Sequence, residues 1–419
     1  MLSIGLFSLF VLFGSGIGLF LYEPKDTTNV SNSEPQCTSR PCVDSVAKNM
    51  RTNKTDITVV NNDCSKLPSF CEKLKRDVNQ FMEFKTESLK DVTDPNIKIC
   101  RFNSGSDNGI TASCLNAFIH LDIDNECDNP FFKKLMEKLR QEQKSVNDIS
   151  TTINPHSIIH DIFNELGEDV VLQNIADNER NALKNCLLNG GNNPFEFMTA
   201  LYKICGLEQN ERFTRSVINK ENGTKTVDSP CLRLTPPLSP EEILHGSNQF
   251  SAQQLFDIVK YQGFNRVVYV NQNDYWMREW KRKHSINFPT RCLCLSFDTL
   301  LPAVNLVMAK FYYNYHIGEF ALSDSKDYIL KALICCTLSK NEILEMKQHS
   351  ILNINKKYSC ILNNPSGKNS STLVVIDPTS EKLVLNVNTG FMPIEAMIGA
   401  LKIDDNNYRV PIMAFYEKK

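Results

Sequence analysis

The chain has 419 residues, of which 42% are hydrophobic and 22% are charged, a composition typical of folded globular proteins. Lys and Arg total 46 against 48 Asp and Glu, so the formal net charge is −2. This balance argues against a protein that binds nucleic acid mainly by charge, and we expect no nucleic-acid partner. The 15 cysteines are too few for a disulfide-rich scaffold.

The N-terminus is an apolar segment. Residues 1–22 contain no charged side chain and are long enough to cross a bilayer as a helix, so we predict a single-pass transmembrane anchor. Lys and Arg follow this segment and do not precede it, which by the positive-inside rule places the rest of the chain in the cytosol. A cleaved signal peptide is the alternative, although it lacks the usual basic start.

A second alternative concerns the compartment. Four Asn-x-Ser/Thr patterns are acceptor sites for N-glycosylation, at Asn29, Asn53, Asn222 and Asn369. A secreted or luminal glycoprotein with paired cysteines would use them, whereas a cytosolic chain keeps its thiols reduced. The odd number of cysteines, 15, favours the cytosolic interpretation.

The rest of the chain divides into segments that differ in composition and in the spacing of apolar residues. Residues 23–63 are polar and read as a stalk, and residues 64–99 form a helical approach segment. The main domain covers residues 100–419. Apolar residues recur at i, i+3 and i+4 through residues 100–210, which predicts helices. Residues 211–419 contain mostly short β-branched or aromatic runs, which predicts antiparallel strands and an α+β fold.

Two local patterns refine this second half. The run TLVVID-PTSE-KLVLNV, residues 372–387, alternates on both sides of a polar turn and predicts a β-hairpin. Residues 251–261 and 339–348 interrupt the strands with helical spacing. Trp276 and Trp280 lie four residues apart among basic residues, so on a helix they share one face. That face either packs against the sheet or forms a partner-binding edge.

One segment has a pattern suited to chemistry. A polar loop containing glycines leads to Cys114, and an apolar, helix-like run follows at once. We therefore predict that Cys114 lies near a helix N-terminus, where the helix dipole lowers the pKa of a thiol and prepares a nucleophile. The chain has no phosphate-binding loop, dinucleotide-binding motif or CxxC pair, and we expect neither a cofactor nor a metal.

The surroundings of Cys114 resemble the cysteine box of the ubiquitin-specific proteases, which are papain-like cysteine deubiquitinases. Residues 109–117 share glycine, threonine, cysteine, leucine and asparagine with that box. Four later segments resemble other parts of the family in the same order. They are residues 190–207 (with Glu196, Phe197 and Leu201), residues 236–250, residues 288–297 and residues 408–419.

This resemblance implies a papain-like fold with a helical thumb followed by an antiparallel palm and fingers. It implies Cys114 as the nucleophile, and ubiquitin or a ubiquitinated protein as the partner. A Gly-His-Tyr motif supplies the general base in this family. The third member of the triad, Asp or Asn, would fall at Asn386 or Asn388.

The departures from the family pattern concern the triad itself. Lys368 or Ser371 stands where the histidine is expected, and no histidine follows His349. An alternative alignment of the cysteine box places Ala112 at the nucleophile position. A cysteine without a base within hydrogen-bond reach is mostly protonated at neutral pH.

We therefore predict a catalytically impaired deubiquitinase homologue that acts by binding. The alternative is an active cysteine deubiquitinase in which Cys114 takes its base from His316 or His349. The remaining histidines of the helical half, His120, His156 and His160, are expected to be structural.

Overall fold

The structure is a computed structural model that describes residues 96–103, 109–123, 127–146, 152–233, 260, 275–296, 327–339, 357–365, 371–377, 384–387 and 401–419. Every described residue belongs to one compact unit, Val60–Lys419.

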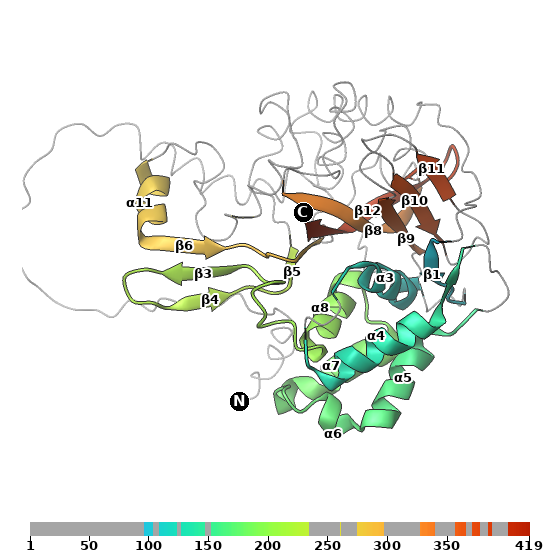
Figure 1. Cartoon of the computed structure of the whole chain (residues 1–419), viewed down its shortest axis with the longest axis horizontal. Helices are drawn as coiled ribbons and strands as arrows, with labels where there is room; N and C mark the ends of the chain where they lie inside the picture. Colours follow the sequence, from blue (N-terminus) through green and yellow to red (C-terminus); the bar gives the residue numbers. More distant parts are fainter. Residues whose placement is uncertain are drawn as a thin grey trace, which may run out of the picture. The chain divides into compact units, whose positions relative to one another are not determined.

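Six helices lie in the described part of residues 96–233 (Figure 1). They are α3 (Gly109–His120), α4 (Pro130–Glu142), α5 (Pro155–Leu166), α6 (Glu168–Val171), α7 (Asp177–Asn189) and α8 (Pro194–Ile204).

Three of these helices begin with the same Asn-Pro pair. The side chains of Asn129, Asn154 and Asn193 accept hydrogen bonds from the first turns of α4, α5 and α8, at 3.1, 3.0 and 2.9 Å. Each proline follows at the first helical position, where its fixed φ and missing N–H suit a helix start. The Asn-Pro pair thus specifies the start of each of these three helices.

The strands form three sheets. The large sheet has seven strands in the order β11-β10-β9-β8-β12-β7-β5, and all its neighbours are antiparallel except β5 and β7. Its strands are β5 (Cys231–Arg233), β7 (Cys292–Ser296), β8 (Tyr328–Ser339), β9 (Tyr358–Pro365), β10 (Ser371–Ile376), β11 (Val384–Val387) and β12 (Asn407–Lys418).

The two smaller sheets flank the helices and the large sheet. One pairs β1 (Lys98–Cys100) with β2 (Gln143–Ser145). The other has the order β4-β3-β6 and consists of β3 (Ser216–Asn219), β4 (Lys225–Val227) and β6 (His284–Asn287). The helix α11 (Tyr275–Lys283) leads directly into β6 (Figure 1).

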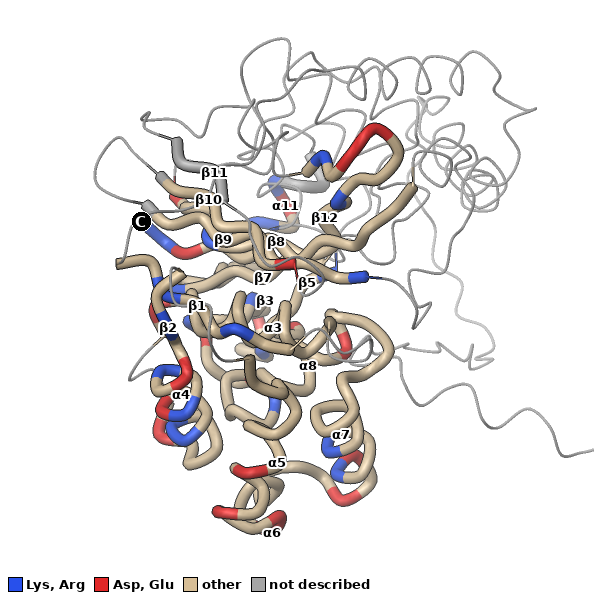
Figure 2. The backbone as a smooth tube through the Cα atoms, turned by 90° about the vertical axis from the view of Figure 1, so that its right-hand side faces the viewer, with Lys and Arg blue, Asp and Glu red and all other residues tan. Residues whose placement is uncertain are grey.

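Helix α3 is the central element of the core. It lies between the large sheet, where it contacts β8 and β9, and the remaining helices (Figure 2). Every residue from Ile110 to Phe118 is buried, which is typical of a helix enclosed on all sides. The ring of Phe118 packs edge-on against Phe132 of α4 and Tyr202 of α8, with centroids 6.3 and 5.7 Å apart.

Several expected elements are confirmed. Helices occur across the helical half, and the hairpin predicted at residues 372–387 is formed by β10 and β11, which pair antiparallel. The helical stretches expected at residues 251–261 and 339–348, and the stalk at 23–63, lie almost wholly outside the described residues.

The predicted fold class is corrected in one respect. We expected an α+β, papain-like fold with an N-terminal transmembrane helix. The described structure is a mixed α and β one, and none of the helices in its described part is long and apolar enough to cross a membrane. The apolar segment at residues 1–22 lies outside the described residues.

Candidate functional site

Helix α3 and strand β9 run side by side in the same direction. A Cβ at Gly109, the first residue of α3, would lie 3.7 Å from the backbone N of Tyr358, the first residue of β9. At the other end, Nε2 of His120 lies 2.8 Å from the carbonyl O of Asn363. Both spans are about 16 Å long, at about 1.5 Å per helical residue and 3.3 Å per strand residue. The N-terminus of α3 therefore meets the start of β9.

Cys114 lies beyond the first turn of α3 and is fully buried. Its Sγ lies 3.9 Å from the carbonyl O of Pro194, at the start of α8. The effect of a helix dipole is confined to the first turn, so this position gains little from it. The first turn holds Ala112, the residue of the alternative alignment.

The expected lowering of the thiol pKa is not found. Burial raises the pKa of Cys114 well above its usual value, and the neighbouring thiols of Cys360, Cys231 and Cys186 raise it further. A buried thiolate would lose its hydration without gaining a positive partner. The structure thus holds this cysteine as a neutral core residue.

Asn116, a residue of the cysteine-box resemblance, has a clear structural role. Its Oδ1 accepts a hydrogen bond from the backbone N of Cys100, and its Nδ2 donates to the carbonyl O of Cys100, both at 3.1 Å. Nδ2 also lies 3.1 Å from the carbonyl O of Ala112 in the preceding turn. One buried amide therefore fastens the edge of β1 to α3.

Ser371, one of the two residues expected at the position of the general base, is not at the N-terminus of α3. Ser371 pairs with Pro365, at the far end of β9 from Tyr358, a separation of about 20 Å along the strand. Lys368 lies outside the described residues. The residue that precedes Tyr358 is Lys357, which is exposed and whose carbonyl O accepts a hydrogen bond from the backbone N of Thr337 at 2.9 Å.

Asn386, one of the two residues expected as the third member of the triad, is also far from the start of β9. Asn386 of β11 pairs with Thr372, which in turn pairs with Asn364, so Asn386 is level with the C-terminal end of α3. Asn388 lies outside the described residues. The sheet register therefore separates Asn386 from the start of β9 by most of the length of that strand.

One carboxylate that the sequence did not single out, that of Asp377, lies level with the start of β9. Asp377 follows β10 directly, and the preceding residue, Ile376, pairs with Cys360 near the start of β9. Its Oδ2 accepts a hydrogen bond from Nη2 of Arg409 at 3.2 Å, and the two side chains are 10% and 3% exposed. The only sequence signal was an acidic residue at the end of an apolar strand. This carboxylate forms an ion pair with the guanidinium of Arg409.

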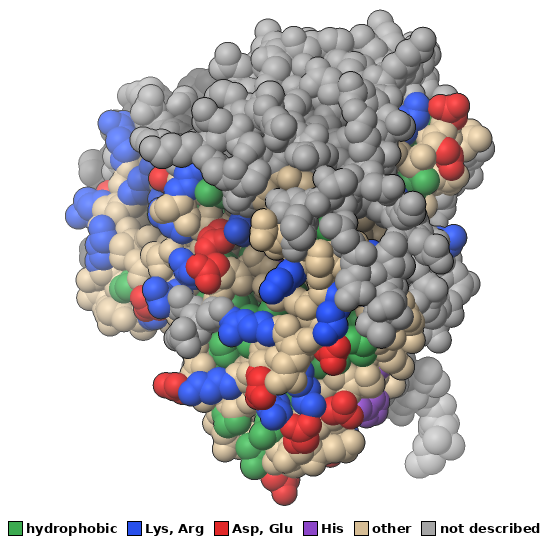
Figure 3. Space-filling model, turned by 45° about the vertical axis from the view of Figure 1, so that its right-hand side comes forward, with side chains coloured by type: hydrophobic (Ala, Val, Ile, Leu, Met, Phe, Trp, Pro, Cys, Tyr) green, Lys and Arg blue, Asp and Glu red, His purple; other side chains and the backbone are tan. Residues whose placement is uncertain are grey.

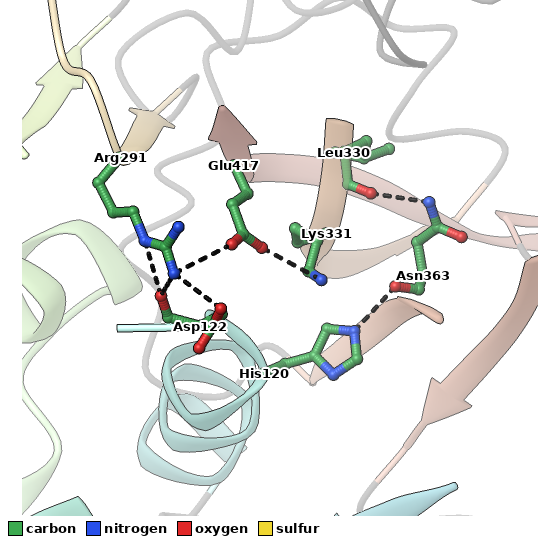
Figure 4. A network of polar contacts seen from close by, with 7 residues as sticks. All are labelled: His120, Asp122, Arg291, Leu330, Lys331, Asn363 and Glu417. Atoms are coloured by element: carbon green, nitrogen blue, oxygen red, sulfur yellow. Dashed lines mark hydrogen bonds and ion pairs between the residues drawn. The ribbon is translucent and has the colours of Figure 1, made fainter. Parts of the chain in front are cut away.

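His120 is the one histidine of α3, and it is unsuited to act as a base for Cys114. The two residues are six apart on one helix, about 9 Å along its axis. The pKa of His120 is lowered to about 4, mainly by burial and to a smaller extent by Lys331, while the hydrogen bond to Asn363 opposes the shift. Its Nε2–H donates to the carbonyl O of Asn363 (Figure 4). His316 and His349, the alternative bases, lie outside the described residues.

Beside His120, four charged residues from four chain segments form an ion-pair network (Figure 4). Arg291 lies 2.7 Å from Asp122 and 3.6 Å from Glu417, and Glu417 lies 3.2 Å from Lys331. The network joins the end of α3 to β12 and β8. Its charges balance, which is typical of a structural cluster.

Within the described ranges, all 11 cysteines are free thiols. No group of three or more His, Cys, Asp or Glu residues in that part of the chain is placed to hold a metal ion.

No family model matches the chain, and no curated protein matches it.

Proposed function

We propose that the chain is a protein-binding domain related to the ubiquitin-specific proteases, that it lacks efficient thiol hydrolysis, and that its ligand is ubiquitin or a ubiquitinated protein. The burial of Cys114 carries this proposal. A nucleophile must reach its substrate as a thiolate, whereas this thiol is fully buried and its pKa is raised.

The arrangement around α3 supports the relation to the family. In the ubiquitin-specific proteases, which the chain resembles, the cysteine box lies at the start of a helix and the Gly-His-Tyr motif follows later in the chain. Here the start of α3 lies against Tyr358. If that tyrosine is the last residue of the motif, the position of the base holds Lys357, whose ammonium offers donors and no acceptor.

The other two positions support the loss of activity. The first turn of α3 presents Ala112, which has no nucleophilic atom. Asp377, a carboxylate level with the start of β9, forms an ion pair with Arg409. Loss of a general base alone typically costs about 10²–10⁴-fold in rate.

The test uses the purified full chain and two assays. Hydrolysis of a ubiquitin C-terminal fluorogenic amide and labelling by a ubiquitin vinyl probe report activity, with Cys114→Ala as the matched variant. We expect no turnover and no labelling in either protein. Turnover by the wild type that Cys114→Ala abolishes would overturn the proposal.

Binding is measured separately by titrating ¹⁵N-labelled ubiquitin with the full chain and following its amide resonances. Saturable shifts without turnover support the proposal. Unchanged resonances at high micromolar protein would remove ubiquitin as the ligand.

A further inference from the structure

The three-stranded sheet β4-β3-β6 and the adjacent helix α11 carry an excess of positive charge. Within residues 216–228 and 275–287 there are six Lys and Arg against three Asp and Glu, although the whole chain has a net charge of −2. We call the six cations the basic surface. They are Lys220, Lys225, Arg278, Lys281, Arg282 and Lys283.

The fold brings these cations together from two segments. Lys220 lies in the turn after β3, and its Nζ donates to the carbonyl O of Lys281 in α11 at 3.2 Å. The backbone N of Lys220 also donates to the carbonyl O of Lys283 at 2.8 Å. In Figure 3 Lys and Arg side chains gather on the left of the molecule, the side on which α11 and β6 lie.

Helix stability explains only part of this cluster. Lys281, Arg282 and Lys283 lie in the last turn of α11, where cations stabilise the helix dipole. Lys220 and Lys225 lie outside that helix, and Arg278 lies before its last turn. Like charges held this close repel one another, and an anionic partner relieves that repulsion.

We propose that the basic surface docks an acidic segment of a partner protein. Carboxylates of the chain itself already bind cations of the basic surface, so these cations are accessible to carboxylate groups. Glu279 binds Arg282 at 2.6 Å and Glu221 binds Lys283 at 3.3 Å. Glu211 likewise binds Lys225, and Lys220 and Arg278 are exposed around these pairs.

A lipid surface fits these observations less well. Membrane-bound basic segments insert exposed apolar side chains beside their cations. The described hydrophobic side chains of these two segments are all at least partly buried, and the side chains of residues 275–277 lie outside the description. The ring of Trp280 stacks on His284, with centroids 4.7 Å apart and planes at 9°.

A long nucleic acid fits less well for a different reason. Outside these two segments the chain is net negative, so an extended polyanion would meet repulsion beyond the basic surface. A short acidic segment of a protein matches the extent of the surface.

The experiment measures fluorescence anisotropy of a fluorescein-labelled peptide of ten glutamates with the full chain at 50 and 200 mM salt. The test variant is Lys220→Glu with Arg278→Glu. The matched control, Lys98→Glu with Lys133→Glu, makes the same charge change at exposed positions elsewhere. Circular dichroism confirms that each variant is folded.

We expect the wild type to bind more tightly at low salt, the test variant to bind at least about tenfold more weakly, and the control to stay within about twofold. Equal weakening in both variants, or no binding by the wild type, would overturn the proposal. Phosphatidylserine vesicles and a 20-base-pair DNA are run in parallel. Tighter binding of either that is lost in the test variant would replace the protein partner with that ligand. The outcome is independent of the hydrolase and ubiquitin assays.

Discussion

Nη2 of Arg409 donates a hydrogen bond to Oδ2 of Asp377 across 3.2 Å, and both side chains are almost completely buried. The pair joins the beginning of β12 to the end of β10, two strands that are not neighbours in the sheet. Because water is excluded there, loss of either side chain would leave the other charge buried without its partner.

Removal of one partner of this pair is predicted to destabilise the domain. Arg409→Met leaves the Asp377 carboxylate buried without its cation, so we expect the free energy of unfolding to fall by about 3–5 kcal/mol. The double variant Arg409→Met with Asp377→Leu removes both charges and should recover part of that loss. Urea unfolding followed by circular dichroism measures both. A loss below about 1 kcal/mol for Arg409→Met would contradict a buried pair.

The thiol of Cys114 is predicted to be unreactive in the folded protein. Burial and a raised pKa both suppress the thiolate, whereas Cys127 is partly exposed and serves as an internal control. Timed iodoacetamide labelling with peptide mass spectrometry should show Cys127 modified at least about 10²-fold faster. Comparable rates at the two positions would mean that Cys114 is accessible and would favour a catalytic role.

Stability is predicted to depend on His120 in mildly acidic solution. The unfolded chain binds a proton at this residue near the ordinary pKa of 6.5, whereas the folded protein does so only near 4. The unfolded state therefore binds more protons between these values, and the free energy of unfolding falls as the pH is lowered from 6.5 to 4, by up to about 3 kcal/mol.

This dependence is measured by urea unfolding at several pH values, with His120→Gln as the control that removes the titrating group. We expect the difference in unfolding free energy between wild type and variant to change across this window. A difference that stays constant from pH 7 to pH 4 would show that His120 titrates normally.

Asn116 is predicted to be a stabilising residue. Asn116→Ala leaves the backbone N–H and carbonyl of Cys100 without their partner, and each such buried group costs about 1–3 kcal/mol. Asn192→Ala, on an exposed amide before α8, is the control and should change stability by less than about 0.5 kcal/mol. Thermal and urea unfolding measure both variants. Equal effects would mean that the Asn116 hydrogen bonds contribute little.

Local signals in the sequence predicted much of the secondary structure. The Asn-Pro pairs before α4 and α8 mark helix starts because capping and a fixed φ act within a few residues. The hairpin of β10 and β11 is visible because its alternation and turn are contiguous. The positions of catalytic residues were not predictable in the same way. The residues around Cys114 are typical of a cysteine at a helix start. However, α3 begins earlier, at Gly109, and Cys114 is fully buried.

The sequence by itself determined which residue types exist: a cysteine in an apolar helix, and no histidine after His349. Only the tertiary structure decided which of them meet. The alignment of α3 along β9 placed Tyr358 at the start of the helix, and the sheet register placed Ser371 and Asn386 at its far end. The burial that raises the pKa of Cys114 comes from elements distant along the chain, because desolvation is a property of packing and not of the local sequence.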